Sequence, residues 1–150
     1  MLPLKKILSP TDFSDPSYLA IKTGAEIAQH FNAQLIIMHI VEPIPVMYTA
    51  HGPLDYNTVE VEAEKRLYVG EELDKIRKHE IPADVASLSK IGMGDPAEGI
   101  VFAAAQENVD LIVMATHGFS GWRRFILGSV TEKVVRSAAR PVLTIREPTK

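Results

Sequence analysis

Two short runs of almost unbroken apolar residues limit most sharply what this chain can fold into. They span residues 34–41, QLIIMHIV, and residues 111–115, LIVMA. A strand with one wet face alternates apolar and polar residues, whereas a strand buried on both faces does not alternate. Such strands are typical of parallel sheets that carry helices on each side. The two runs therefore predict a parallel sheet in an α/β protein.

Helical patterns separate the expected strands along the whole chain. Aspartates at Asp15 and Asp95, each followed by proline, are expected to cap two of the helices. A length of 150 residues suits about one domain, so residues 1–150 are predicted to form one. The alternation predicts a doubly wound, Rossmann-like or flavodoxin-like domain, in which a parallel five-stranded sheet has helices on both faces. The strands are expected at residues 5–9, 34–41, 84–91, 111–115 and 142–145.

Two of the expected helices have an apolar side that should face the sheet. In the helix at 58–80 this side is predicted to hold Val59, Ala63, Leu67, Gly70, Leu73 and Ile76. In the helix that follows Asp95 it is predicted to hold Ala97, Ile100, Val101, Ala104 and Ala105. Residues 42–57, with three prolines, form an unusually long connection, and such connections are usually functional or mobile.

The composition excludes several classes of function. A net charge of −3 gives no basic field that would attract nucleic acid or an anionic membrane. The chain has no cysteine, which excludes disulfides, thiolate catalysis and thiolate metal sites. No apolar stretch approaches the ~20 residues of a membrane helix, and the short apolar start does not suit a signal peptide. We therefore expect a cytoplasmic protein.

Ligands of doubly wound sheets bind outside the carboxyl ends of the strands, where the strand order reverses. The segment after the first strand, SPTDFSD, brings Pro10, Thr11 and Asp12 to this edge. A carboxylate beside a hydroxyl can bind ribose, adenine or a phosphate-bound metal ion. The alternative is a capping turn, because Asp and Thr also satisfy free backbone N–H groups at the start of a helix.

The segment after the fourth strand has the features of a phosphate site. Gly118 and Gly128 bracket nine residues, and Ser129 is predicted to begin the helix at 129–138. Glycine allows a backbone to approach a phosphate closely, and the start of a helix offers free N–H groups to an anion. The hydroxyls of Ser129 and Thr131 add donors. The alternative is a capping box, in which Ser129 and Glu132 satisfy the same N–H groups internally.

Other segments carry weaker signals. The lysine motif of phosphate-binding NTPases is absent, and the Gly92–Met–Gly94 pattern is better explained as a tight turn into a helix. His39 lies in an apolar strand and is expected to be a satisfied core histidine. His117 lies between the glycines and is assigned either to the ligand or to a structural role. Arg124 can close over phosphate by charge-assisted hydrogen bonds or remain solvated.

Taken together, three segments resemble the universal stress protein family, and specifically its ATP-binding branch. They are KILSPTDFS at residues 6–14, MHIV at 38–41 and RPVLTI at 140–145. The nucleotide motif of the family, G-x2-G-x9-G-[ST], falls on Ala115, Gly118, Gly128 and Ser129. Its spacing and its last three positions match, whereas alanine replaces the first glycine. That alanine fits if its backbone has a negative φ.

The resemblance implies an ATP site, and it implies Mg²⁺ bound more by the phosphates than by protein. By position, Pro10, Thr11 and Asp12 would line the adenosine end, and Ile40 would offer backbone groups to the adenine. Met114 and Ala115 would border the ribose. The phosphates would be held largely by main-chain N–H groups of Gly118, Gly128, Ser129, Val130 and Thr131.

The resemblance also implies a homodimer that pairs through the last strand. We expect regulation of an unidentified protein partner that depends on the bound nucleotide. Two alternatives remain open. One is an enzyme that slowly hydrolyses ATP or phosphorylates itself, for which Asp12 and His117 are the only candidate bases. The other is a dimeric scaffold without nucleotide.

Overall fold

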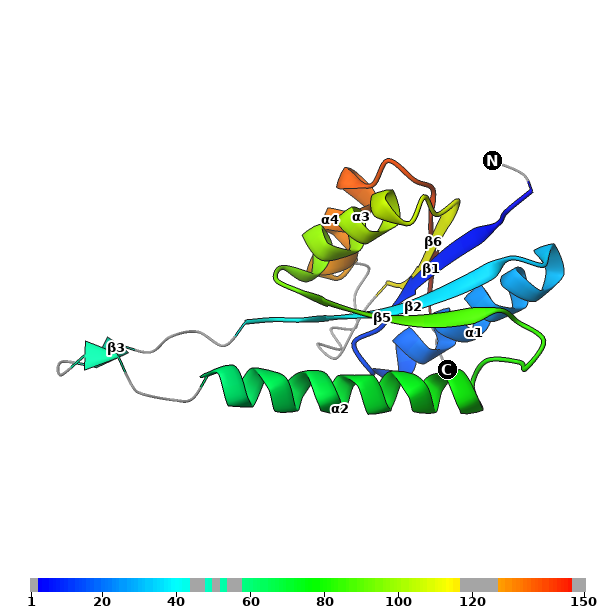
Figure 1. Cartoon of the computed structure of the whole chain (residues 1–150). Coiled ribbons are helices and arrows are strands. Elements are labelled where there is room, and N and C mark those ends of the chain that lie inside the picture. Colours follow the sequence, from blue (N-terminus) through cyan, green and yellow to red (C-terminus); the bar gives the residue numbers. More distant parts are fainter. Residues whose placement is uncertain (1–2, 44–47, 50–51, 54–57, 117–126, 147–150) are drawn as a thin grey trace.

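Five parallel strands form one sheet in the order β5-β2-β1-β6-β7, as Figure 1 shows. The structure is a computed structural model that describes residues 3–43, 48–49, 52–53, 58–116 and 127–146. The predicted doubly wound parallel sheet is confirmed. Three of the strands have the predicted bounds. The first is shifted by one residue, and the third begins three residues and ends two residues later than predicted. The strands are β1 (Lys6–Pro10), β2 (Gln34–Val41), β5 (Ser87–Met93), β6 (Leu111–Ala115) and β7 (Val142–Ile145).

Two helices cover each face of this sheet (Figure 1). Helices α1 (Asp15–Phe31) and α2 (Thr58–His79) enclose one core with the side chains of Leu35 and Ile37. Helices α3 (Pro96–Gln106) and α4 (Ser129–Ser137) enclose the other core with Ile36 and Met38. Successive residues of β2 thus enter opposite cores, which explains why this strand has no polar face.

A small hairpin interrupts the long connection after β2. Strands β3 (Tyr48–Thr49) and β4 (Gly52–Pro53) pair antiparallel, with Tyr48 opposite Pro53 and Thr49 opposite Gly52. These strands were not predicted from the sequence, because two-residue strands are too short to produce an alternating pattern. Figure 1 places β3 beyond the first turn of α2, away from the five-stranded sheet.

The apolar side of α2 differs from the predicted one in its first half. Leu73 and Ile76 are buried as predicted, but Leu67 is 68% exposed and Ala63 is also exposed. Val69 is buried instead, so the buried positions follow the i, i+4, i+7 spacing from Val69. In Figure 1 the first turns of α2 extend past the strands, which leaves that part of the helix no sheet to cover.

The helix starts correct two further details. Ser14, not Asp15, is the N-cap of α1, and its side chain accepts a hydrogen bond from the N–H of Ser17. Asp95 caps α3 as predicted, because its side chain accepts from the N–H of Glu98. In α3 the predicted inward residue Ala105 is exposed, whereas its neighbour Ala103 is buried.

The strand order reverses beside β1. The chain passes from β1 to β2 and β5 on one side, and only then to β6 and β7 on the other. The carboxyl ends of β1 and β6 therefore begin loops that diverge to opposite faces. A crevice forms at such a position in doubly wound sheets.

Candidate functional site

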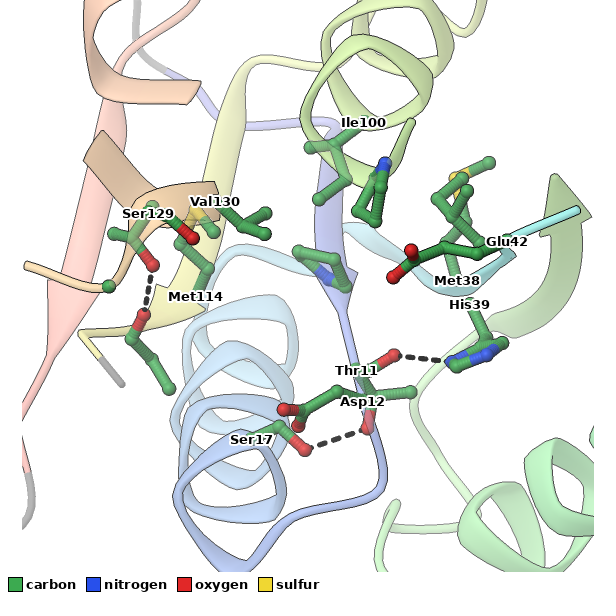
Figure 2. Close-up of a pocket in the computed structure, with 16 residues that line it drawn as sticks. Thr11, Asp12, Ser17, Met38, His39, Glu42, Ile100, Met114, Ser129 and Val130 are labelled. Atoms are coloured by element: carbon green, nitrogen blue, oxygen red, sulfur yellow. Dashed lines mark hydrogen bonds between the residues drawn. The ribbon is translucent and has the colours of Figure 1, made fainter. Parts of the chain in front are cut away.

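A cavity of about 340 Å³ lies at this reversal of strand order, within the usual size range of small-molecule sites. In Figure 2, Ser129, Val130 and Met114 lie on one side of the cavity, and Met38, His39 and Glu42 lie on the other. Thr11 and Asp12 lie between them. Of the predicted site residues, the cavity brings together Pro10, Thr11, Asp12, Ile40, Met114, Ala115, Gly128, Ser129, Val130 and Thr131.

Three predicted site residues lie outside the described part of the chain. They are His117, Gly118 and Arg124, all in the segment 117–126. Their roles therefore stay predictions. The first position of the nucleotide motif is described, and it lies at the end of β6, where the backbone is extended. This position does not need a positive φ, so alanine is compatible with it.

Hydrogen bonds fix the loop after β1. The N–H of Thr11 donates to the carbonyl oxygen of Met38 at 2.8 Å. The Thr11 hydroxyl lies 2.8 Å from the Ser17 hydroxyl and accepts from the N–H of Phe13 at 2.9 Å. Because Ser17 already donates to the carbonyl oxygen of Ser14, Thr11 must donate to Ser17. The hydroxyl of Thr11 is thus used within the loop.

Asp12 also takes part in the turn into α1. Its Oδ1 accepts from the N–H of Ser14 at 3.1 Å and from the Ser14 hydroxyl. One oxygen of this carboxylate thus forms the capping turn that was the alternative interpretation of this segment. Asp12 also lines the cavity, and its role toward a ligand stays a prediction.

Phe13 has a left-handed backbone, with φ of 65°. This conformation is costly for a bulky side chain and is found mostly where surrounding contacts impose it. Here the ring of Phe13 stacks on the ring of His39, with centroids 4.6 Å apart and planes at 25°. The sequence analysis did not predict this conformation, because phenylalanine is not a residue that marks such turns.

Strand β2 continues past the end of β1 and leaves backbone groups beside the cavity. The pairing of β1 with β2 ends at Pro10 and Met38, and the Met38 carbonyl faces β1. Successive residues of a strand direct their backbone groups to opposite neighbours. The Val41 carbonyl accepts from Gly94 on the other side, so the N–H and C=O of Ile40 face the β1 side, beyond its last paired residue. This orientation supports the predicted role of the Ile40 backbone.

The start of α4 provides an anion-binding geometry. Gly128 is the N-cap and Ser129 is the first helical residue, so the predicted capping box is wrong: the described residues supply no side-chain cap here. Gly128 donates its own N–H to Thr116, at 2.7 Å. The next N–H groups, those of Ser129, Val130 and Thr131, are the ones that helix geometry leaves without intrahelical partners.

The hydroxyl of Thr131 has a structural role. It is buried and donates to the carbonyl oxygen of Ala115 at 2.9 Å. This bond fixes the first turn of α4 to the end of β6. A ligand at the helix start would therefore meet the main-chain N–H of Thr131, while the Ser129 side chain is exposed and unused as a cap.

The charged side chains that line the described part of the cavity are all acidic. The described lining residues include two carboxylates, Asp12 and Glu42, and neither lysine nor arginine. Within the described residues, no group of three or more His, Cys, Asp or Glu side chains is placed to hold a metal ion. Attraction for an anion in this part of the site therefore comes from the positive end of α4.

Sequence reasoning missed six lining residues. His39 was predicted to be a satisfied core residue; its Nδ1 does have a partner, 2.8 Å away at the Thr11 carbonyl, but the ring is only half-buried and lines the cavity. Chain order could have indicated that His39 lies near the site, because β1 and β2 are parallel and end at the same edge of the sheet. The missed residues are Ser17, Met38, His39, Glu42, Pro96 and Ile100.

None of the described helices combines the length and apolar character needed to cross a membrane.

Comparisons with known proteins agree with this fold. A model of the universal stress protein family matches residues 3–146. The universal stress protein MJ0531 of Methanocaldococcus jannaschii is 36% identical over 97% of this chain and 84% of its own length. A universal stress protein of Thermus aquaticus is 35% identical over 95% of this chain and 98% of its own length.

Solved structures show the same similarity. The structure of MJ0577 from Methanocaldococcus jannaschii has a TM-score of 0.81 and 26% identity, and the match covers 98% of this chain and 99% of that one. A universal stress protein in complex with cAMP has a TM-score of 0.66 at 24% identity, covering 95% and 97%. The Archaeoglobus fulgidus protein in complex with dAMP has a TM-score of 0.61 at 19% identity, covering 97% and 99%.

Proposed function

The chain belongs to the universal stress protein family, and we propose that it binds an adenine nucleotide, specifically ATP, in the cavity beside β1. Occupancy by the nucleotide would order the loops around the cavity and change a surface that a protein partner recognises. A ligand shifts such an equilibrium only by its different affinity for the two states. The proposed function is therefore regulation that depends on the nucleotide.

The observation that carries this proposal is the first turn of α4. Its N–H groups at Ser129, Val130 and Thr131 border the cavity, and no described side chain caps them. Such N–H groups, together with the helix dipole, favour phosphate. The N–H of Gly128, at the N-cap, already donates to the carbonyl oxygen of Thr116. Gly128 therefore helps only by having no side chain, which leaves room for a phosphate beside the helix start.

The opposite wall of the cavity suits an adenosine. The backbone N–H and C=O of Ile40 offer a donor and an acceptor at one edge, which matches the paired acceptor and donor on the edge of adenine. Met114, Ile100 and Pro10 provide apolar surface, and Asp12 offers a carboxylate to ribose hydroxyls. Two proteins of this fold that are described with cAMP and dAMP support an adenine ligand.

Mg²⁺ would accompany ATP through the phosphate oxygens and water. The described residues provide no cluster of three metal ligands, and Mg²⁺ is commonly bound by one or two carboxylates together with substrate phosphates. The described cavity carboxylates are Asp12 and Glu42, which follow the ends of β1 and β2. Asp12 is also one of the two predicted bases for hydrolysis. The other predicted base for hydrolysis, His117, is not described, and we propose a nucleotide-binding regulator in preference to an ATPase.

A single N–H group can be removed to test the phosphate site. Proline is favoured at the first helical position and lacks an N–H, so Ser129→Pro should keep the helix while removing one donor. The ψ of 150° at Gly128 suits a residue that precedes proline. Ser129→Ala is the matched control, since it removes the hydroxyl and retains the N–H.

Calorimetry with protein stripped of nucleotide would measure ATP affinity for the three proteins. A hydrogen bond to a charged group contributes roughly 1.5–3 kcal/mol, so Ser129→Pro should weaken ATP binding by about tenfold or more. Ser129→Ala should stay within roughly threefold of wild type. Equal affinities of Ser129→Pro and wild type, or no heat from wild type at millimolar ATP, would refute the proposed site.

A further inference from the structure

We propose that His39 is a positioning residue of this site, which holds the loop after β1 in the geometry that a ligand requires. The inference rests on the proposed function, because it assigns a role within the same nucleotide site. His39 comes directly before Ile40, whose backbone groups border the cavity, and its ring reaches across to the loop that carries Asp12 (Figure 2). It therefore joins the two halves of the adenosine wall.

The hydrogen bond of His39 defines which ring nitrogen carries the proton. Nδ1 lies 2.8 Å from the main-chain carbonyl oxygen of Thr11. A carbonyl oxygen only accepts, so Nδ1 must be the donor and must hold a proton in both the neutral and the charged ring. The neutral ring is consequently the Nδ1–H form. The contact with the Thr11 carbonyl thus sets the tautomer of the ring.

The same ring supports an unfavourable backbone conformation. Phe13, with its φ of 65°, stacks on His39 and donates its N–H to the Thr11 hydroxyl. Left-handed backbone at a bulky residue persists only where neighbouring contacts maintain it. The ring of His39 thus contacts the loop on both sides of Asp12, through the carbonyl of Thr11 and through the ring of Phe13.

Positioning of this kind affects ligand affinity without any contact between His39 and the ligand. If the loop were free to leave its left-handed conformation, binding would have to restore it, and that ordering would reduce the affinity. A loop held in place before the ligand arrives avoids this loss. We therefore expect changes at His39 to weaken ATP binding more than they lower the melting temperature.

Two amide variants separate the hydrogen bond from the size of the side chain. The side-chain nitrogen of asparagine can occupy the place of Nδ1, whereas that of glutamine lies farther out, near the place of Nε2. His39→Asn should therefore keep the bond to Thr11, and His39→Gln should lose it. Both variants lose the ring that stacks on Phe13, so both should bind ATP more weakly than wild type. We expect His39→Gln, which also loses the hydrogen bond, to bind roughly tenfold more weakly than His39→Asn. Their melting temperatures should be similar to each other.

A measurement without nucleotide tests the geometry directly. Nitrogen-15 NMR of the neutral wild-type ring should show a protonated Nδ1 and an unprotonated Nε2. A ring protonated at Nε2, or equal ATP affinities of the Asn and Gln variants, would overturn the role of His39. Wild type that fails to bind ATP would instead refute the proposed function, and the NMR result would still decide whether the contact with Thr11 exists.

Discussion

At the scale of single residues, Asp110 shows how one carboxylate joins two neighbouring strands. Its Oδ2 accepts from the N–H of Lys5 at 2.7 Å and from the N–H of Lys6 at 3.0 Å. These two backbone hydrogen bonds favour the charged form and lower the pKa of Asp110 below its ordinary value. The start of β1 is thereby fixed beside the start of β6.

The lowered pKa predicts how stability depends on pH. A carboxylate with a depressed pKa in the folded state stabilises that state above its unfolded pKa of about 3.9, and this contribution is lost as the pH falls through the lower, folded pKa. Asp110→Asn should therefore lower the free energy of unfolding by about 1 kcal/mol at pH 7. The difference from wild type should shrink as the pH falls below about 4.

Urea unfolding measured at several pH values would check this expectation. Asp74→Asn is a suitable control, because Asp74 is 60% exposed on α2 and only meets Arg77 at 3.6 Å. Surface pairs of this kind contribute little. A difference between Asp110→Asn and wild type that stayed constant down to acidic pH would contradict the role assigned to this carboxylate.

At the scale of elements, glycines in two helices differ in how much space separates them from the sheet. A Cβ at Gly99 of α3 would lie 2.7 Å from Cδ1 of Ile40, which is too close for any real contact. A Cβ at Gly24 of α1 would lie 3.4 Å from Cδ1 of Leu35, which is an ordinary contact. The glycine of α3 thus allows a close approach to β2, and that of α1 does not serve this purpose.

Alanine substitutions should therefore have opposite effects in the two helices. Gly24→Ala should raise the free energy of unfolding by about 0.5–1 kcal/mol through helix propensity. In Gly99→Ala the same gain in helix propensity should be outweighed, because the new methyl group displaces the Ile40 side chain. The free energy of unfolding should therefore fall. Ile40→Val removes the clashing methyl, so the double variant should be more stable than the two single effects predict. Chemical unfolding of the four proteins would measure this; strict additivity would contradict the clash.

Much of the fold could be predicted from the sequence, because the strands buried on both faces have unbroken apolar runs. The runs at 34–41 and 111–115 matched the observed strands. The first half of α2 was assigned wrongly, since an apolar residue such as Leu67 gives the same signal whether or not a sheet lies beneath it. The cap of α1 was misplaced by one residue because Ser14 and Asp15 are both good caps.

The candidate site was predicted in part for a similar reason. Chain order places the loops after β1 and β6 at one edge. Hydroxyl side chains mark both loops, and glycines mark the second. The contribution of His39 could not be predicted, because it depends on the left-handed backbone of Phe13, which no residue type at that position indicates. The uncapped start of α4 was obscured by Ser129 and Glu132, which match a capping box one residue too late.

At the scale of the whole molecule, β7 is an edge strand, with a sheet neighbour on one side only among the described residues. It is the last strand in the sheet, and β6 is its neighbour. Pro141 and Ile145 direct their carbonyls to β6. By the alternation of a strand, Val142 and Thr144 direct their backbone groups outward. We propose that a second copy of the chain pairs with this edge to form a homodimer.

Proline at an outward position should separate dimerisation from folding. Thr144→Pro removes an N–H that β6 does not use, so it should convert the dimer to a monomer with little loss of stability. Leu143→Pro is the contrasting variant, because it removes an N–H that faces β6 and should lower the melting temperature. Light scattering after gel filtration would report the masses. A Thr144→Pro protein that keeps the mass of a dimer would refute pairing through β7.

The walls of the cavity come from residues as far apart as Pro10 and Thr131. During synthesis, the wall made by β1 is complete early, but the wall made by α4 appears only when most of the chain exists. A nascent chain or an early-truncated fragment therefore lacks one wall of the cavity. Under the proposed function, nucleotide binding would report that α4 has docked and that synthesis of the domain is essentially finished.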